Sequence, residues 1–268
     1  MKILSGKELR PILKDIIQKE MEGADVSFYL FSDKEDFPSQ AYLRGIKKTL
    51  DSFQVDYVED YLDRNASKEE NIEKFKARSK GRAILLARPL KVDYENELVS
   101  LIPPNQDADM FHIENRGKLF SGDLRYLTAT SKSVEFILEQ YHIETEGKKA
   151  VILGRSLEVG YPCFQLLNKK NAAVTLLHSK VSPDVISSYV RDCDILVLAT
   201  GKSNLVRKED IPSKAIIIDC GFNPHGGDLG FIPKEGEVKA YTPVPGGVGA
   251  LTSYFLLENA VFLKKQSL

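Results

Sequence analysis

A glycine-containing turn between a predicted strand and a predicted helix has the residues needed to bind a phosphorylated ligand. The strand is the apolar run VIL at residues 151–153, and the turn continues with Gly154, Arg155, Ser156 and, further on, Gly160. Backbone N–H groups and the positive end of a helix dipole meet at such a turn, and Arg155 adds a full charge. The strict G-x-G-x-x-G spacing is absent. The turn alone therefore leaves an ordinary strand-to-helix connection equally open.

The end of the next predicted strand indicates which nucleotide would fit. Residues 174–177 form a short apolar strand that is followed by His178, Ser179 and Lys180. In a dinucleotide-binding sheet, an acidic residue at this place normally binds the ribose hydroxyls. Here the loop offers a hydroxyl and a cation but no acid, so it can accommodate a 2′-phosphate on the ribose. The pattern favours NADP over NAD, against the simpler interpretation that these are polar loop residues.

A second distinctive stretch is TPVPGGVG at residues 242–249, immediately before an apolar C-terminal segment. Its two prolines, Pro243 and Pro245, fix the backbone φ angle, and either can form a cis peptide bond. Its three glycines allow the backbone to approach a flat ligand closely. A rigid linker between domains would have a similar composition. The position just before the last helix favours the wall of a ligand cleft.

Apolar residues recur with strand and helix periods in alternation along most of the chain. Ser39 is placed to cap the first turn of one helix, and residues 102–116 are expected to form a loop. We expect helices at residues 6–21, 39–53, 67–77, 93–101, 131–141, 183–191 and 251–263, and strands at 26–31, 55–62, 83–87, 151–153, 174–177, 195–199 and 216–220.

This order predicts an α/β protein with two domains. Residues 1–135 form an N-terminal α/β domain, and residues 136–250 form a Rossmann-like, doubly wound domain. The C-terminal segment, residues 251–268, is apolar enough to need packing nearly all round. We therefore expect its helix to pack back on the first domain.

Composition and charge exclude several functional classes. The chain has 268 residues, 43% of them hydrophobic, and Lys+Arg 37 against Asp+Glu 38 give a net charge of −1. A general nucleic-acid binder would show a basic excess. No apolar run approaches the ~20 residues of a membrane span, and the first residues lack the apolar core of a signal peptide. We expect a cytoplasmic protein with neither nucleic-acid nor membrane partners.

The other candidate groups carry weaker signals. The three cysteines are too far apart for a C-x-x-C pair, so we expect thiols in or near the core. The four histidines show no metal-ligand spacing, and no metal site is predicted. Asp107 and Asp109 share a loop, where such pairs are usually solvated. Tyr42 shares a helical face with Ile46, and a tyrosine in that setting is more often a packing residue.

Taken together, these segments resemble the bifunctional methylenetetrahydrofolate dehydrogenase/methenyltetrahydrofolate cyclohydrolase family over nearly the full length. The resemblance is carried by four segments in a fixed order: G-R-S-x-x-V-G-x-P from Gly154, His178-Ser179, D-x-G-x-N from Asp219, and residues 242–249 with Leu251-Thr252. It implies a two-domain homodimer with a folate cleft between the domains. It also implies hydride transfer from methylenetetrahydrofolate to a nicotinamide, followed by hydrolysis of the methenyl product.

The resemblance also assigns roles to individual residues. Tyr42 matches the tyrosine that packs against the pterin and assists the chemistry, and Asp109 matches the acid that holds the pterin's amino edge, a task suited to a carboxylate. Residues that match the loop near the folate and the nicotinamide are Pro245, Gly246, Gly247 and Val248. Residues at cofactor-contact positions are Gly154, Arg155, Ser156, Ser179 and Phe222, the last in place of the family's usual aliphatic residue.

Departures from the family are concentrated around the folate chemistry. In the family pattern Y-x-x-x-K-x-K, Ile46 occupies the catalytic lysine position, while Lys48 matches the second lysine. Lys47 is adjacent, but one residue turns the side chain by ~100° around a helix. Ala87 replaces the glutamine partner of that lysine, and Met110 replaces a glycine.

These departures affect the two reactions unequally. Hydride transfer depends mainly on holding two ring systems close together, whereas hydrolysis needs an acid/base group, typically a contribution of ~10²–10⁴-fold. We therefore expect an NADP-dependent dehydrogenase of tetrahydrofolate derivatives with weak or absent cyclohydrolase activity. A non-catalytic folate and nucleotide binder, a dehydrogenase of another substrate, and a fully bifunctional enzyme in which Lys47 or another group replaces the lysine stay open as alternatives.

Overall fold

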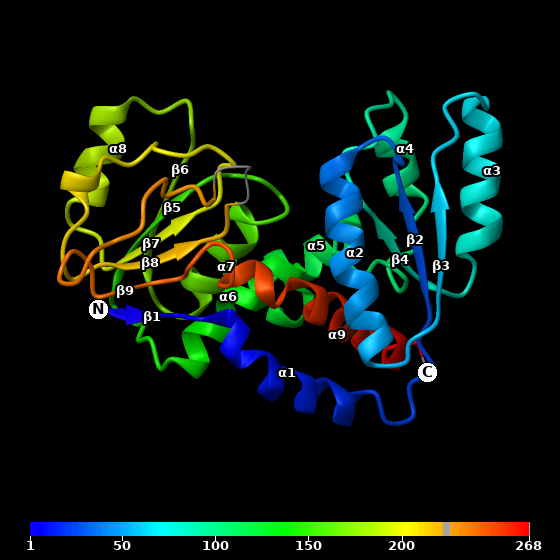
Figure 1. Cartoon of the computed structure of the whole chain (residues 1–268), viewed down its shortest axis with the longest axis horizontal. Coiled ribbons are helices and arrows are strands. Elements are labelled where there is room, and N and C mark those ends of the chain that lie inside the picture. Colours follow the sequence, from blue (N-terminus) through cyan, green and yellow to red (C-terminus); the bar gives the residue numbers. More distant parts are fainter. Residues whose placement is uncertain (222–225, 268) are drawn as a thin grey trace. The chain divides into compact units, whose positions relative to one another are not determined.

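The computed structural model describes residues 1–221 and 226–267, which form two compact units (Figure 1). Unit 1 consists of Met1–Ile12 and Leu119–Thr252, and unit 2 consists of Leu13–Lys118 and the chain from Ser253 onward. This division differs from the predicted domains, which placed residues 1–12 and 119–135 in the first domain. The difference at the N-terminus has a direct cause, because β1 (Lys2–Ile3) pairs with β9 (Ala240–Tyr241) of unit 1.

Unit 1 is built on a six-stranded sheet in the order β1-β9-β8-β7-β5-β6, and every strand pair is parallel. Its inner strands are short apolar runs that are buried on both faces, as expected for a covered parallel sheet. The remaining strands are β5 (Lys149–Leu153), β6 (Ala173–Leu177), β7 (Ile195–Leu198) and β8 (Ile216–Asp219).

Helices cover this sheet on both faces (Figure 1). From β5 the chain moves outward to β6 through α7 (Gly160–Lys169), and then back to β7 through α8 (Pro183–Val190). Right-handed crossovers in opposite directions place these two helices on opposite faces. The unit also contains α6 (Ala129–Gln140) and short 3₁₀ turns at Leu124–Tyr126, Lys208–Asp210 and Val248–Ala250. The predicted doubly wound, Rossmann-like fold is thus confirmed.

Unit 2 contains a three-stranded parallel sheet in the order β3-β2-β4. The central strand is wholly buried, and Tyr29 and Phe31 on it pack against Phe75 of a covering helix. The strands are β2 (Phe28–Ser32), β3 (Tyr57–Tyr61) and β4 (Ala83–Leu86). The helices are α1 (Gly6–Glu20), α2 (Phe37–Ser52), α3 (Lys68–Ser79), α4 (Glu95–Ser100), α5 (Ile113–Phe120) and α9 (Thr252–Lys265). Three of these helices, α1, α5 and α9, begin in one unit and end in the other.

Two local predictions in unit 2 are wrong. Asp36, and not Ser39, caps α2: its carboxylate accepts hydrogen bonds from the Ser39 backbone N–H at 3.1 Å and from the Ser39 hydroxyl at 2.7 Å. A carboxylate near a helix N-terminus also interacts favourably with the helix dipole. The segment expected to be a loop up to residue 116 contains the start of α5.

The C-terminal helix α9 packs against unit 2, as predicted. Asn259, which is fully buried, donates a hydrogen bond to the Ala108 carbonyl at 2.9 Å. Near the start of the helix, the hydroxyl groups of Thr49 and Ser253 lie 2.7 Å apart. Tyr254 meets Phe53 edge to face. Within the described residues, no helix is both long enough and apolar enough to span a bilayer.

Candidate functional site

The turn after β5 is shaped by two glycines that leave no room for a side chain. Gly154 has a φ of +125°, and a Cβ there would lie 2.1 Å from the Ala199 carbonyl oxygen. A Cβ at Gly160, the first residue of α7, would lie 2.0 Å from the carbonyl oxygen of Gly154. The helix N-terminus is therefore held directly against the end of the strand. This close approach is what the predicted phosphate-binding turn requires.

Polar groups of this turn are available to an anion. Arg155 is exposed, and among the described residues the backbone N–H groups of Arg155 and Ser156 have no hydrogen-bond partner. The Ser156 hydroxyl accepts the Val159 N–H at 3.1 Å, which closes the turn. Ser179 is half-buried in the loop after β6, where residues 178–181 contain no acid. These groups fit a phosphorylated nucleotide.

The loop at residues 242–249 is tied into unit 1. Gly246 has a φ of +109° and its carbonyl accepts the Lys7 N–H at 2.9 Å. A Cβ at Gly247 would lie 2.6 Å from the Pro243 carbonyl oxygen. The Val244–Pro245 peptide bond is cis. Pro245 is exposed and Gly246 is half-buried, whereas Gly247 and Val248 are buried. Of the four predicted contact residues, the first two thus offer accessible surface.

Phe222, also predicted to contact the cofactor, lies outside the described residues. Shortly before it, the nearby Cys163 of α7 and then burial raise the pKa of the Cys220 thiol well above its usual value. A thiol with a raised pKa is a poor nucleophile. Cys163 and Cys193 are buried, in agreement with the predicted core thiols.

In unit 2, the structure brings the two residues predicted to act on the folate close together. Tyr42 lies on α2, and its residue remains 39% exposed. Burial of its hydroxyl, and then the negative charge of Asp109, raise the pKa of Tyr42 well above its usual value. Asp109 is half-buried. Tyr42 therefore stays a neutral phenol, able to donate a hydrogen bond, beside a carboxylate.

Three residues at which the sequence departs from the family pattern are apolar and buried. Ile46, one helical turn after Tyr42, is 1% exposed, and Ala87 and Met110 are also buried. Met110 has a φ of +60°, a conformation that favours glycine, which the family has there. No cation contributes to the pKa shift of Tyr42 among the described residues.

Lys47 is held by another partner. Its Nζ lies 2.9 Å from both carboxylate oxygens of Glu59 on β3. Hydrogen bonding to Glu59 is the main reason that the pKa of Lys47 is raised. A charged lysine engaged by two oxygens of another side chain is a poor substitute for an amine beside Tyr42.

Asp107 contradicts the expectation of a solvated pair of acids. It is 1% exposed, and its carboxylate accepts hydrogen bonds from the His112 N–H at 2.7 Å and from the Asn115 side-chain amide at 3.0 Å. Burial raises its pKa, and these hydrogen bonds oppose the shift. Asp107 thus fixes the loop that carries Asp109.

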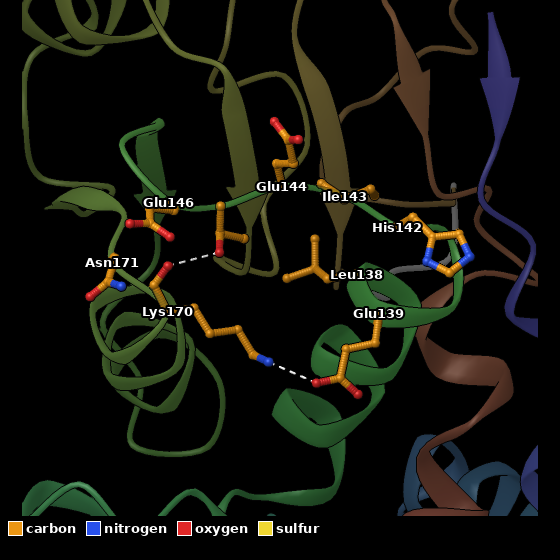
Figure 2. A pocket seen from close by; sticks show the side chains of 9 residues that line it. Leu138, Glu139, His142, Ile143, Glu144, Glu146, Lys170 and Asn171 are labelled. Carbon is orange, nitrogen blue, oxygen red and sulfur yellow. Dashed lines mark hydrogen bonds and ion pairs between the residues drawn. The ribbon is translucent and has the colours of Figure 1, made fainter.

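A surface hollow of about 640 Å³ lies elsewhere in unit 1 (Figure 2). It is formed by the end of α6 and the turn between α7 and β6, and Lys170 on its wall pairs with Glu139 at 2.7 Å. Its lining includes His142 and Glu146 but none of the predicted site residues. It lies near the amino ends of β5 and β6, whereas ligands of open α/β sheets bind outside the carboxyl ends.

Comparisons with known proteins agree with this geometry. A family model described as the NAD(P)-binding domain of tetrahydrofolate dehydrogenase/cyclohydrolase matches residues 128–268. The bifunctional protein FolD of Staphylococcus aureus (strain bovine RF122 / ET3-1) is 34% identical over 278 residues, covering 98% of this chain and 96% of the relative.

Solved structures show the same similarity. The bifunctional FolD enzyme of Campylobacter jejuni has a TM-score of 0.90 at 29% identity and covers 100% of both chains. The Trypanosoma brucei enzyme, described as complexed with NADP cofactor and inhibitor, has a TM-score of 0.85 at 26% identity, covering 99% of this chain and 97% of that one. The chain therefore belongs to the tetrahydrofolate dehydrogenase/cyclohydrolase family.

Proposed function

We propose that this protein is an NADP-dependent methylenetetrahydrofolate dehydrogenase that has lost most or all of its cyclohydrolase activity. The single observation that carries the proposal is the contrast between its two halves. The nucleotide turn keeps its glycines, Arg155 and its available N–H groups. Beside Tyr42, by contrast, the position of the family's catalytic lysine is occupied by the buried Ile46.

The nucleotide assignment is supported by the charges at the carboxyl ends of β5 and β6. Arg155 is exposed after β5, and Ser179 with Lys180 follows β6 without an acid. An acid at this place would repel a 2′-phosphate, whereas a hydroxyl and cations attract it. The Trypanosoma brucei relative is described with NADP. The cofactor, when bound, accepts the hydride; the chain's own residues bind and orient it.

The folate assignment is supported by the pair Tyr42 and Asp109. A carboxylate suits the amino edge of a pterin, because it can accept two parallel hydrogen bonds. The phenol of Tyr42 stays protonated, since the pKa is raised by burial and by the nearby Asp109 charge. Loss of a hydride leaves a positive charge shared by two folate nitrogens, and the negative charge of Asp109 stabilises it.

The proposed loss of hydrolysis follows from what surrounds this pair. Attack of water on the methenyl carbon needs a group that can take and return a proton. Isoleucine cannot do so, Ala87 cannot replace the missing glutamine, and Lys47 is bound to Glu59. A bifunctional enzyme would need another acid/base group at this place.

One assay distinguishes the alternatives. The protein is incubated with methylenetetrahydrofolate and NADP, and the absorbances of NADPH and of methenyltetrahydrofolate are followed separately. Equal growth of both signals supports the proposal. NADPH formation with rapid decay of added methenyltetrahydrofolate would show a bifunctional enzyme. Binding of both ligands without any reaction would favour the non-catalytic binder, which Ile46, Ala87 and Met110 would also suit. The homodimer and the cytoplasmic location stay predictions.

A further inference from the structure

Two buried aspartates lie where β7 and β8 end, and neither was predicted from the sequence as a site residue. Asp219 is the last residue of β8, and Asp228 follows in the loop that returns toward the sheet. Each is 3% exposed. Burying a carboxylate costs free energy unless it is hydrogen-bonded. The hydrogen-bond partners of Asp219 and Asp228 therefore indicate the role of each side chain.

Asp219 fixes the segment that carries Asp228. One of its carboxylate oxygens, Oδ1, accepts the backbone N–H groups of Gly221 at 2.9 Å and of Asp228 at 3.0 Å. The other, Oδ2, accepts the N–H of Leu229 at 2.9 Å. The N–H of Asp219 itself donates to the hydroxyl of Thr242 at 2.8 Å. The end of β8 is thereby joined to two other segments of the chain.

Asp228 in turn fixes the turn after β7. Its Oδ2 atom accepts the N–H groups of Thr200 at 2.5 Å and of Gly201 at 2.9 Å, and the Thr200 hydroxyl at 3.0 Å. Two successive backbone N–H groups directed at one oxygen form the kind of concavity that binds anions in other proteins. Here the protein fills that concavity with its own carboxylate.

Glycines make this arrangement possible in a reciprocal manner. A Cβ at Gly227 would lie 2.2 Å from Oδ2 of Asp219, and a Cβ at Gly221 would lie 2.1 Å from Oδ1 of Asp228. Each carboxylate thus packs against a glycine beside the other aspartate. Any side chain at either glycine would displace a carboxylate from its backbone partners.

The sheet order indicates what these loops face. In a doubly wound sheet, each half binds one nucleotide of a dinucleotide across the carboxyl ends. β5 and β6 carry the predicted phosphate turn and Ser179, so in a bound dinucleotide β7 and β8 would face the second nucleotide, which bears the nicotinamide. Because Asp228 occupies the N–H groups of Thr200 and Gly201, this turn offers a fixed wall and no second phosphate site.

We propose that Asp219 and Asp228 are positioning residues that hold the turn after β7 and the segment at residues 227–229 in the shape needed to place the nicotinamide half of NADP for hydride transfer. The inference rests on the proposed function and adds to it a second pair of residues. They act through the backbone of other residues and need not touch the cofactor.

The test compares two ligands that share the adenosine half. Dissociation constants of NADP and of 2′,5′-ADP are measured for the wild-type protein and for Asp228→Asn, which keeps an oxygen acceptor but removes the negative charge that strengthens the three hydrogen bonds accepted by Oδ2. We expect binding of 2′,5′-ADP to change less than twofold, while binding of NADP weakens by about tenfold. We also expect kcat to fall by about 10- to 100-fold, since small misplacements in a hydride-transfer geometry have effects of that order.

Two further variants keep the result interpretable. Asp184→Asn is the matched control, because the Asp184 side chain is 87% exposed and pairs with Arg207 at the surface; all its constants should equal those of the wild type. Thr200→Val removes one of the three hydrogen bonds and should shift the NADP constant in the same direction by about two- to threefold. It serves as the probe if Asp228→Asn does not fold.

The outcomes separate this inference from the proposed function. Equal weakening of NADP and 2′,5′-ADP, or no weakening of either in a folded variant, would overturn the positioning role. Absence of methylenetetrahydrofolate oxidation by the wild-type protein would instead reject the proposed function. The ratio of the two binding constants would still decide whether Asp228 positions the nicotinamide half.

Discussion

Replacing Ile46 by lysine would restore the amine that the family has beside its tyrosine. The buried position of Ile46 determines how much this change would destabilise the protein. Ile46 is 1% exposed and lies on α2 one turn after Tyr42, on the same face of the helix. Burial of an isoleucine side chain contributes about 1.5–3 kcal/mol, of which the lysine stem keeps a part. Desolvation of the ammonium adds to the loss. We expect Ile46→Lys to lower the free energy of unfolding by roughly 2–4 kcal/mol at pH 7.

The sign of the pH dependence checks this explanation. Burial depresses the pKa of a lysine in the folded protein below its value in the unfolded chain. Between these two pKa values the unfolded chain binds more protons, so stability rises with pH. The loss measured by urea unfolding should therefore be smaller at pH 9 than at pH 7. Ile46→Met, which stays neutral and of similar size, should show no such dependence.

The gain in hydrolysis should be partial. An acid/base group contributes ~10²–10⁴-fold in general, but at Ala87 the family's glutamine is missing. We expect Ile46→Lys alone to raise the decay rate of methenyltetrahydrofolate by about tenfold at most, and the double variant Ile46→Lys/Ala87→Gln to raise it further if the buried site near Ala87 accommodates the longer side chain. Decay that is equally fast in the wild type, in Ile46→Met and in Ile46→Lys would refute the reasoning that the lysine is what hydrolysis lacks.

Two more predictions follow from the pKa shifts. The pKa of Tyr42 is raised well above its usual value by burial and by Asp109. A profile of kcat against pH should therefore show no fall from Tyr42 ionisation up to about pH 10. The variant Tyr42→Phe should lower kcat without changing the shape of this profile. Asp36 has a pKa lowered to about 2, mainly by its hydrogen bond from Lys91, with an Nζ–Oδ1 distance of 2.6 Å. Its stabilising effect is present above the ordinary aspartate pKa and is lost as pH falls toward 2. Lys91→Ala should therefore lower the free energy of unfolding by about 0.5–1 kcal/mol at pH 6, because the lysine side chain is 59% exposed, and by less at pH 3.

Elements with strong periodicity were predictable from the sequence, and those that depend on distant partners were not. The strands β5, β7 and β8 are apolar runs buried on both faces, and their positions agree with prediction within two residues. The pairing of β1 with β9 joins two-residue strands more than 200 residues apart, for which a local pattern gives no signal. Helix α5 has the sequence IENRGKLF, in which glycine and asparagine are poor helix formers.

The same distinction holds for the candidate site. Gly154 and Gly160 were recognisable from the sequence because the turn between a strand and a helix needs residues without a side chain at these positions. Asp107 was expected to be solvated because its partner Asn115 lies on the helix that the sequence did not predict, and that asparagine is fully buried. Asp228 carries no local signal at all, since its partners Thr200 and Gly201 precede it by more than 25 residues.

The charge balance around Tyr42 gives a physical reason why one activity can persist without the other. Oxidation of the methylene bridge turns the neutral ring system around that bridge into a cation. An ammonium group roughly 6 Å from that charge, at an effective dielectric constant of about 20, would oppose its formation by on the order of 3 kcal/mol. With Ile46 in the lysine position and Lys47 bound to Glu59, Asp109 is the charge that the structure couples to Tyr42. Under the proposed function, the site is therefore electrostatically better suited to forming the methenyl cation than to the proton transfers that would hydrolyse it, and we expect the missing lysine to weaken hydrolysis and to favour oxidation.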